Sequence, residues 1–325
     1  MTAAGPRVVS VVIPTHHRPE RLEHAVASAL EQALPDGWET EVVVALSDPA
    51  WEPDRAATAR LAVDPRVVVT SSVTPGPAAA RNSGIRASRG EVVAMLDDDC
   101  TARPGWLAAG LAALANADLV QGRTLPAGPV GATDHTLSVS PPSWLWESCN
   151  LMVRRELIEQ AGLFDEHFTH PQAKPHFGED AEWGWRLVRS GARAAFVPGA
   201  VVEHAVERQS LNSYLRYHAK ARWFPWLFRQ VPEARRHFYL GYFVSRRHAV
   251  MVGSVGLFGL AGVSSVTGHP RAAKTMAIGG MVGWLSPARG DLLDIAKQVA
   301  VRTLVEGVQY SSMVYGSLRW RRILL

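Results

Sequence analysis

The chain has 325 residues, 47% of them hydrophobic, so it can bury a full core and carry a second region besides one large domain. Its only cysteines, Cys100 and Cys149, lack metal-motif spacing, which excludes a disulfide-rich scaffold or a zinc finger and predicts a reducing compartment. The first apolar run, Val8–Ile13, is too short for a signal peptide, and we expect none.

The net charge of +4 conceals a division along the chain. Residues 1–206 hold 17 Lys and Arg against 25 Asp and Glu, a net charge of −8, whereas residues 207–325 hold 17 against 5, a net charge of +12. Long uncharged runs in the basic part favour anionic lipid over nucleic acid as its partner. We therefore predict a binding or catalytic domain over 1–206 and a membrane-associating or oligomerising tail over 207–325.

Strands and helices alternate over the acidic part. A strand at Val8–Ile13 should end at Pro14-Thr15, and an amphipathic helix should follow it. Further strands are predicted at 41–46 and 66–69, and an alanine-rich helix at 78–87. This alternation with short loops predicts an α/β fold: a Rossmann-like, mostly parallel sheet covered by helices, with a crevice at the strand ends.

Three consecutive carboxylates end the next predicted strand. Val92–Leu96 is a short apolar run, as in a buried parallel strand, and Asp97, Asp98 and Asp99 follow it directly. Three neighbouring carboxylates repel one another unless a cation lies among them. Mg²⁺ or Mn²⁺ is the economical choice, because both prefer carboxylate oxygens and bridge them to substrate phosphates. A solvated acidic turn is the simpler alternative.

Motifs in a fixed order along residues 7–205 resemble those of family 2 glycosyltransferases with the GT-A fold. Each motif alone is weak, but their order and separations are specific. The matching segments are Val11–Thr15, Pro77–Gly84, Leu96–Asp99, Glu179–Leu187 and, as the terminal histidine motif, Val201–His204.

This resemblance implies a nucleotide-sugar donor and a divalent cation, Mn²⁺ or Mg²⁺, as cofactor. Asp99 would be a direct metal ligand, Asp97 would contact the metal or the ribose, and His204 would complete the metal shell. Without the resemblance, a lone histidine is more often a surface or core residue. The implied donor-binding set is Pro14, Thr15, Asp48, Arg81, Asp97 and Asp98.

The nucleotide base is the least defined part of the predicted donor. The family usually places an aspartate just after the second strand, where this chain offers Ser47 and Asp48, while Ala45 and Leu46 depart from the pattern. We expect a UDP- or dTDP-sugar, and a purine nucleotide remains open. Arg81 would reach a phosphate or lie on the helix surface.

Asp180 is the predicted general base, with Glu179 as the next candidate. An acceptor hydroxyl needs a carboxylate to take its proton as it attacks the anomeric carbon, and one displacement inverts configuration. Alternatively, both carboxylates only stabilise the first turn of a helix through its dipole. The preceding loop, 167–176, would close over the acceptor or be a plain surface loop. No Gln-x-x-Arg-Trp element follows, so we expect single transfer rather than polymer synthesis.

The tail combines aromatic, basic and apolar stretches. Ser210–Gln230 predicts a helix broken at Pro225, at a membrane surface or packed on the domain. His248–Pro270 has 23 residues without a charge, enough to span a core of about 30 Å. The next uncharged run, Thr275–Ala288, is shorter, and the basic residues of the connecting turn, Arg271 and Lys274, oppose its translocation.

We therefore expect a protein at the cytoplasmic face of the cell membrane, peripheral or with a hairpin that dips into or spans the bilayer. Its acceptor would be a lipid-linked sugar or a cell-envelope glycan, and its tail could also form a homo-oligomer. The alternative is a non-catalytic sugar-nucleotide-binding or assembly subunit. A nucleotidyltransferase is weaker, because no glycine-rich phosphate loop occurs near the N-terminus.

Overall fold

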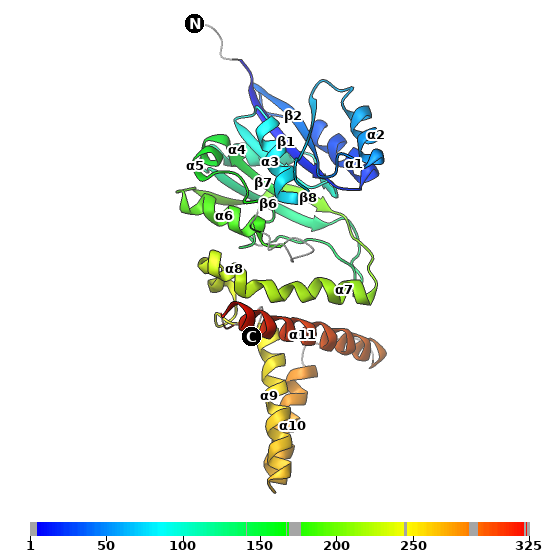
Figure 1. Ribbon diagram of the computed structural model, residues 1–325, viewed down its shortest axis with the longest axis vertical. Coiled ribbons are helices and arrows are strands. Elements are labelled where there is room, and N and C mark those ends of the chain that lie inside the picture. The colour runs from blue at the N-terminus through cyan, green and yellow to red at the C-terminus, as the bar shows by residue number, and fades with distance from the viewer. Residues whose placement is uncertain are drawn as a thin grey trace. The chain divides into compact units, whose positions relative to one another are not determined.

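Figure 1 shows the computed structural model of the chain. The structure describes residues 5–140, 142–166, 168, 177–243, 246–285, 292–321 and 323, so the loop 167–176 lies outside the described residues except for Phe168. The chain divides into two compact units. Unit 1 comprises Met1–Val130 and His135–Glu207, and unit 2 comprises Gly131–Asp134 and Arg208–Leu325.

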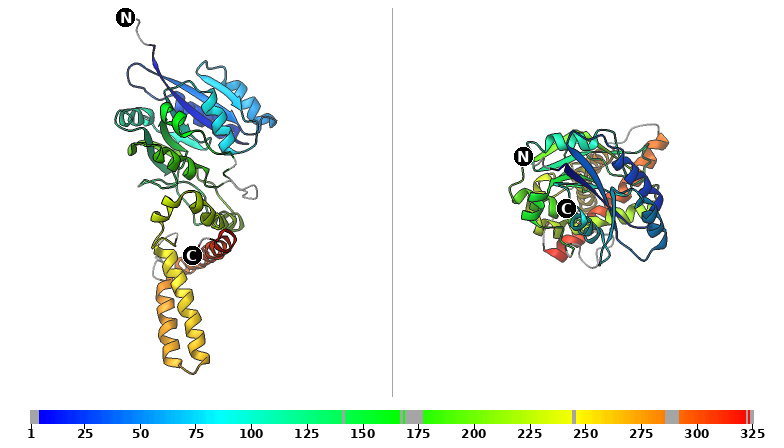
Figure 2. Two further views of the ribbon diagram at one scale, coloured as in Figure 1. Left: turned by 60° about the vertical axis from the view of Figure 1, so that its left-hand side comes forward. Right: turned by 90° about the horizontal axis from the view of Figure 1, so that it is seen from above.

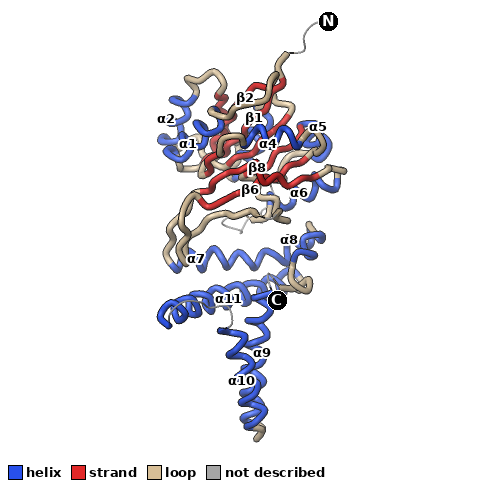
Figure 3. Tube along the Cα trace, turned by 180° about the vertical axis from the view of Figure 1, so that it is seen from behind, coloured by secondary structure: helices blue, strands red, loops and turns tan. Residues whose placement is uncertain are grey.

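Unit 1 is built on an eight-stranded sheet in the order β3-β2-β1-β4-β7-β6-β8-β5 (Figure 3). The first four strands pair in parallel, whereas β7 is antiparallel to both neighbours and β5 to β8. The predicted α/β fold is confirmed, and its antiparallel strand pairs are β4–β7, β6–β7 and β5–β8. The strands are β1 Arg7–Thr15, β2 Trp38–Leu46, β3 Val67–Ser71, β4 Val92–Leu96, β5 Cys100–Ala102, β6 Leu119–Pro126, β7 Asn150–Arg154 and β8 Ala194–His204.

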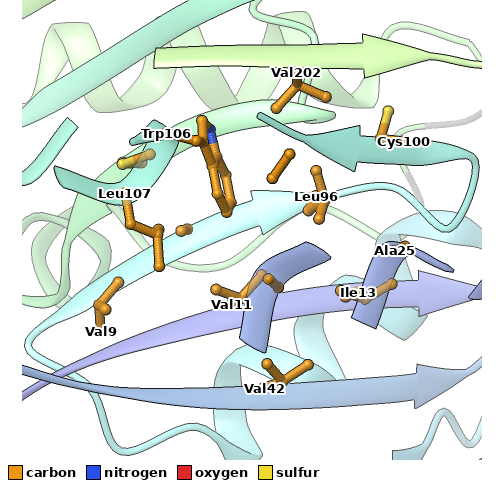
Figure 4. Close-up of a cluster of buried hydrophobic side chains, with 14 of the residues drawn as sticks. Val9, Val11, Ile13, Ala25, Val42, Leu96, Cys100, Trp106, Leu107 and Val202 are labelled. Carbon is orange, nitrogen blue, oxygen red and sulfur yellow. The ribbon is translucent and has the colours of Figure 1, made fainter. Parts of the chain in front are cut away.

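Helices cover both faces of this sheet because alternate strand residues point to opposite sides. Val11 and Ile13 belong to the core cluster that includes α1, α2 and α4, whereas Val12 packs with α3, α5 and α6. Figure 4 shows the first cluster, in which Trp106 and Leu107 of α4 pack over the strands. The helices are α1 Pro19–Leu30, α2 Glu52–Leu61, α3 Pro77–Ala87, α4 Trp106–Ala113, α5 Arg155–Ala161 and α6 Glu179–Arg189.

The end of β1 contributes to a cleft at one edge of the sheet. The strand continues through Pro14 to Thr15 rather than ending at the proline, because the fixed φ of proline is compatible with extended backbone. Pro14 lies opposite Ala45 of β2. Since β1 and β4 are parallel neighbours, the loops that follow Thr15 and Leu96 leave the same edge of the sheet.

Unit 2 is helical, and its long last helix packs on its first ones. α11 contacts α7, α8 and the short 3-10 helix η1. The rings of Trp223 and Trp320 lie 6.0 Å apart, and a Cβ at Gly316 would overlap the carbonyl oxygen of Arg222. The elements are α7 Leu211–His218, η1 Ala219–Trp223, α8 Phe224–Gln230, η2 Pro232–His237, α9 Arg246–Val266, α10 Pro270–Leu285 and α11 Leu292–Trp320.

Two sequence predictions for unit 2 are wrong in detail. The helix of the aromatic stretch changes at η1, and Pro225 lies in the first turn of α8, where a proline is tolerated. Arg271 and Lys274 lie at the start of α10, because the connecting turn is Thr267–His269. α9 and α10 lie side by side as a helical hairpin (Figure 2).

Within the described residues, α9 alone is long and apolar enough to cross a membrane. Its window His248–Val266 has a mean hydropathy of 1.8, and 19% of it is buried within the structure. Large apolar side chains of the hairpin face solvent: Leu260, Val263 and Val266 on α9, and Ile278 and Met281 on α10.

Candidate active site

A cleft of about 450 Å³ opens in unit 1 beyond the ends of β1 and β4. The loop after β2 and the Pro/Gly-rich entry to α3 form its other walls, so the cleft lies where ligands bind in open α/β sheets. The site residues predicted from the sequence that line it are Pro14, Thr15, Arg81, Asp97, Asp98 and Asp99.

Asp98 joins the two loops that form the floor of the cleft. One oxygen, Oδ2, accepts hydrogen bonds from Thr15 Oγ1 at 2.9 Å and from the backbone N–H of His16 at 3.2 Å. The other, Oδ1, lies 3.1 Å from Arg18 Nη1. Burial raises the pKa of Asp98 to about 6, against the effect of the Arg18 guanidinium. Asp98 is therefore engaged by the protein through both oxygens.

Arg81 connects the aspartate triad to the start of α6. Its guanidinium lies 3.0 Å from Asp97 Oδ1, 3.3 Å from Asp180 Oδ1 and 3.7 Å from Glu179 Oε1. Only 7% of its side chain is exposed, so Arg81 is not on the helix surface. Arg18 and Arg81 thus supply positive charge to the triad, which the sequence argument assigned to a metal alone.

Asp180 lies in the first turn of α6, two residues after Gly178, whose left-handed φ of 93° turns the chain into the helix. Its Oδ2 accepts a hydrogen bond from the backbone N–H of Ser148 at 3.1 Å. Burial raises the pKa of Asp180 to about 6, opposed by Arg81 and reinforced by Glu179. Such a carboxylate is a suitable proton acceptor near neutral pH. Glu179 is less accessible: 10% of its side chain is exposed, against 26% for Asp180.

His204 faces Asp99 across the pairing of β5 with β8, which aligns Cys100 with His204. His204 Nε2 lies 3.5 Å from Asp99 Oδ1, and Nδ1 lies 2.8 Å from the carbonyl oxygen of Ala205. A carbonyl only accepts, so the Nδ1 that faces it carries a proton, and Nε2 faces the Asp99 carboxylate. A short contact between Nε2 and a carboxylate oxygen needs either a proton or a metal ion between the two atoms.

The residues at this position fit a divalent cation. Ligand atoms of Asp99, Cys100 and His204 lie within 4.8 Å of one another, and all three residues are buried. A histidine whose other nitrogen donates to a backbone carbonyl is the usual arrangement of a metal ligand. Asp97 is not one of these three residues; its carboxylate accepts a hydrogen bond from Arg81.

Asp48, the predicted contact to the nucleotide base, lies outside the lining of the cleft. Its carboxylate is exposed and lies 3.1 Å from His17 Nε2, whose ring lies 4.2 Å from that of Trp51. Ser47 does line the cleft, and its hydroxyl accepts the backbone N–H of Gly76. Of the two residues that the sequence offered for the base, only Ser47 therefore lines the cleft.

Arg18 and Glu207 belong to the site but were not predicted from the sequence. Arg18 lies in the loop after β1 and Glu207 three residues beyond β8, and their side chains lie 3.1 Å apart. The sequence did contain one signal for Arg18, because this residue lies three positions after the end of a strand that leads to the predicted crevice. Its partners became visible only with the strand order, because they lie 80 to 189 positions away in the sequence.

The family model for glycosyl transferase family 2 matches residues 10–174, half of the chain. The chain belongs to glycosyltransferase family 2. This assignment confirms the enzyme class expected from the ordered motifs, and residues 10–174 include both arginines and the aspartate triad of the cleft.

Curated relatives of this family 2 glycosyltransferase include glycosyltransferase AglE of Haloferax volcanii, 27% identical over 63% of this chain and 68% of the relative. The succinoglycan biosynthesis protein ExoO of Rhizobium meliloti is 28% identical over 64% of this chain and 63% of the relative. A pre-mycofactocin glycosyltransferase of Mycobacterium tuberculosis is 34% identical over 40% of this chain but only 30% of the relative.

Among solved structures, the transferase resembles the mannosyltransferase PcManGT from Pyrobaculum calidifontis, determined with GDP-Man and Mn²⁺. The TM-score is 0.58 at 18% identity, over 98% of this chain and 88% of the other. This likeness confirms the GT-A-type fold.

Proposed function

We propose that this transferase moves one sugar from a nucleotide sugar to a hydroxyl of a lipid-linked or cell-envelope glycan acceptor, with inversion at the anomeric carbon. The observation that carries the proposal is the placement of Asp180. Arg81 and the backbone N–H of Ser148 hold its carboxyl group beside the aspartate-lined cleft, and the pKa of this group is near 6. Asp180 takes the proton of the acceptor hydroxyl as the new glycosidic bond forms. The name of ExoO supports a polysaccharide product.

The cleft residues support the binding of a nucleotide-sugar donor. Thr15 and Asp98 hold the loop after β1 against the triad, which orients the wall that the nucleotide meets. Asp99 and His204 would hold a divalent cation, which when bound stabilises negative charge on the leaving diphosphate. The Mn²⁺ complex of PcManGT supports this choice of cation.

Removal of divalent cations should weaken donor binding at least about tenfold, because Asp99 and His204 can no longer share a cation with the phosphates. Calorimetry with and without EDTA measures the change. Asp99→Asn should abolish the EDTA effect, whereas Asp118→Asn, an acidic residue paired with Arg193 elsewhere in unit 1, should preserve it. Equal donor affinity in both conditions would refute the metal requirement.

Mass spectrometry of products tests the reaction itself. The purified transferase is offered UDP-, dTDP- and GDP-sugars with a lipid extract, and a mass increase of one sugar in the extract is the expected result. Donor binding without any transfer would instead favour the non-catalytic subunit.

Unit 2 supports a place at the membrane, and we propose that its hairpin enters the cytoplasmic leaflet. α9 has 21 residues, about 31 Å of helix, and its exposed apolar side chains would be costly in water. Exposed Arg271 and Lys274 lie near the turn, which favours a re-entrant hairpin. Basic residues near an anionic surface contribute about 1 kcal/mol each.

Cell fractionation should leave the full-length transferase with membranes in molar salt and release it with detergent, because salt screens charges but does not extract inserted apolar helices. Release by salt alone would indicate surface binding without insertion. Soluble protein at low salt would contradict the membrane proposal, and a measured oligomer would then assign the apolar hairpin to self-association.

A further inference from the structure

Arg18 joins three carboxylates from different parts of unit 1. Its Nη1 lies 2.6 Å from Asp99 Oδ2 and 3.1 Å from Asp98 Oδ1, and its Nη2 lies 3.1 Å from Glu207 Oε1. Asp99 is also the carboxylate that faces His204, so one side chain meets the arginine through Oδ2 and the candidate metal position through Oδ1.

Two cations at one carboxylate compete. A guanidinium 2.6 Å from Asp99 neutralises the charge that would attract a divalent cation and repels that cation at short range. Arg18 is also 38% exposed and lines the donor cleft, so its guanidinium has an open route away from the aspartates.

We propose that Arg18 is a built-in counter-ion of the metal site, which holds Asp99 when no metal is bound and yields it when a divalent cation binds. The released guanidinium then turns into the cleft, where it meets the anionic diphosphate of the donor. Arg18 thus opposes the metal in the free transferase and contacts the donor in the metal-loaded one. This inference rests on the proposed metal-dependent donor binding.

Arg21 provides a matched control. It lies on α1, one turn from Arg18, and its Nη1 is 2.8 Å from the same Glu207 oxygen. No contact of Arg21 with Asp98 or Asp99 occurs among the described residues, and Arg21 does not line the cleft. Loss of Arg21 therefore removes a similar charge and a similar ion pair without freeing Asp99.

The test measures Mn²⁺ affinity by electron paramagnetic resonance of free Mn²⁺, without nucleotide, for the parent, Arg18→Gln and Arg21→Gln. Arg18→Gln should bind Mn²⁺ about tenfold more tightly than the parent, because a charge-assisted hydrogen bond to Asp99 no longer has to break. Arg21→Gln should stay within about twofold. In saturating Mn²⁺, Arg18→Gln should bind UDP or GDP, whichever the parent prefers, about tenfold more weakly.

The opposite signs of these two effects separate the proposal from a structural role. If Arg18→Gln weakens both Mn²⁺ and nucleotide binding, or leaves Mn²⁺ affinity unchanged, the proposal is overturned. Arg18→Lys keeps the charge with fewer hydrogen-bond donors, so its Mn²⁺ and nucleotide affinities should lie between those of the parent and Arg18→Gln. It replaces Arg18→Gln in the test if that variant fails to fold.

Failure of the proposed function gives a different pattern. If neither the parent nor Arg18→Gln binds Mn²⁺, the metal requirement and the counter-ion proposal both fall. If the parent binds Mn²⁺ and nucleotide but Arg18→Gln matches it in both, only the counter-ion proposal falls. Detectable Mn²⁺ binding by Arg18→Gln alone would support the proposal most directly.

Discussion

Asp180→Asn should lower turnover by about 10²–10⁴-fold while donor affinity changes by no more than a few-fold, because the amide keeps the volume of the side chain but cannot accept a proton. The amide oxygen can still accept the hydrogen bond from the Ser148 N–H, so the start of α6 should keep its position. Turnover by product mass spectrometry and donor binding by calorimetry measure the two quantities.

The pH dependence of the parent tests the same assignment. The base acts in its ionised form, and the pKa of Asp180 is raised to about 6, so turnover should rise with pH through about 6 and level off above it. At pH 5 the rate should be about tenfold below its plateau.

Glu182→Gln is the matched control for the base. Glu182 lies on the same helix, pairs with Arg186 four residues later and does not line the cleft. The turnover of Glu182→Gln should therefore stay close to that of the parent. If Asp180→Asn remains within a few-fold of the parent while Glu179→Gln is inactive, the base is Glu179.

Arg81→Met should destabilise unit 1 by about 3–5 kcal/mol at pH 8, because it removes the positive partner of buried Glu179 and of half-buried Asp97 and Asp180. Denaturant unfolding followed by the fluorescence of the tryptophans measures the loss. The same variant should also lose donor binding, since Asp97 would no longer be held at the cleft.

The destabilisation should shrink as the pH falls. The pKa of Asp180 is already raised to about 6 in the presence of Arg81, and without that cation it rises further. Protonation at pH 5.5 therefore removes part of the unpaired charge in the variant, and its free energy of unfolding should approach that of the parent.

Arg86→Met is the control for this prediction. Arg86 lies on the same helix, α3, is largely exposed and, among the residues that the structure describes, has a single ion pair, to Glu166 at 3.7 Å. Its loss should change stability by less than about 1 kcal/mol. A loss for Arg81→Met no larger than that for Arg86→Met would show that the buried carboxylates find other compensation.

Much of the fold could be predicted from local patterns. The apolar run before Asp97 and the alternation of strands with helices depend on neighbouring residues, and the structure has β4 and α3 within one residue of the predicted segments. The enzyme class could also be predicted from local patterns, because each of the ordered motifs is a short contiguous stretch. The charge division and the uncharged run at His248–Pro270 also follow directly from the sequence.

The partners within the site depended on tertiary structure. The sequence predicted a cation beside the aspartates, but only the parallel pairing of β1 with β4 brings Arg18 to Asp98 and Asp99. Likewise, the pairing of β5 with β8 sets His204 against Asp99, and Arg81 of α3 meets Glu179 and Asp180 at the start of α6. Strand order decides these contacts because side chains 80 or more positions apart meet only after the sheet has formed, and no local pattern encodes that order.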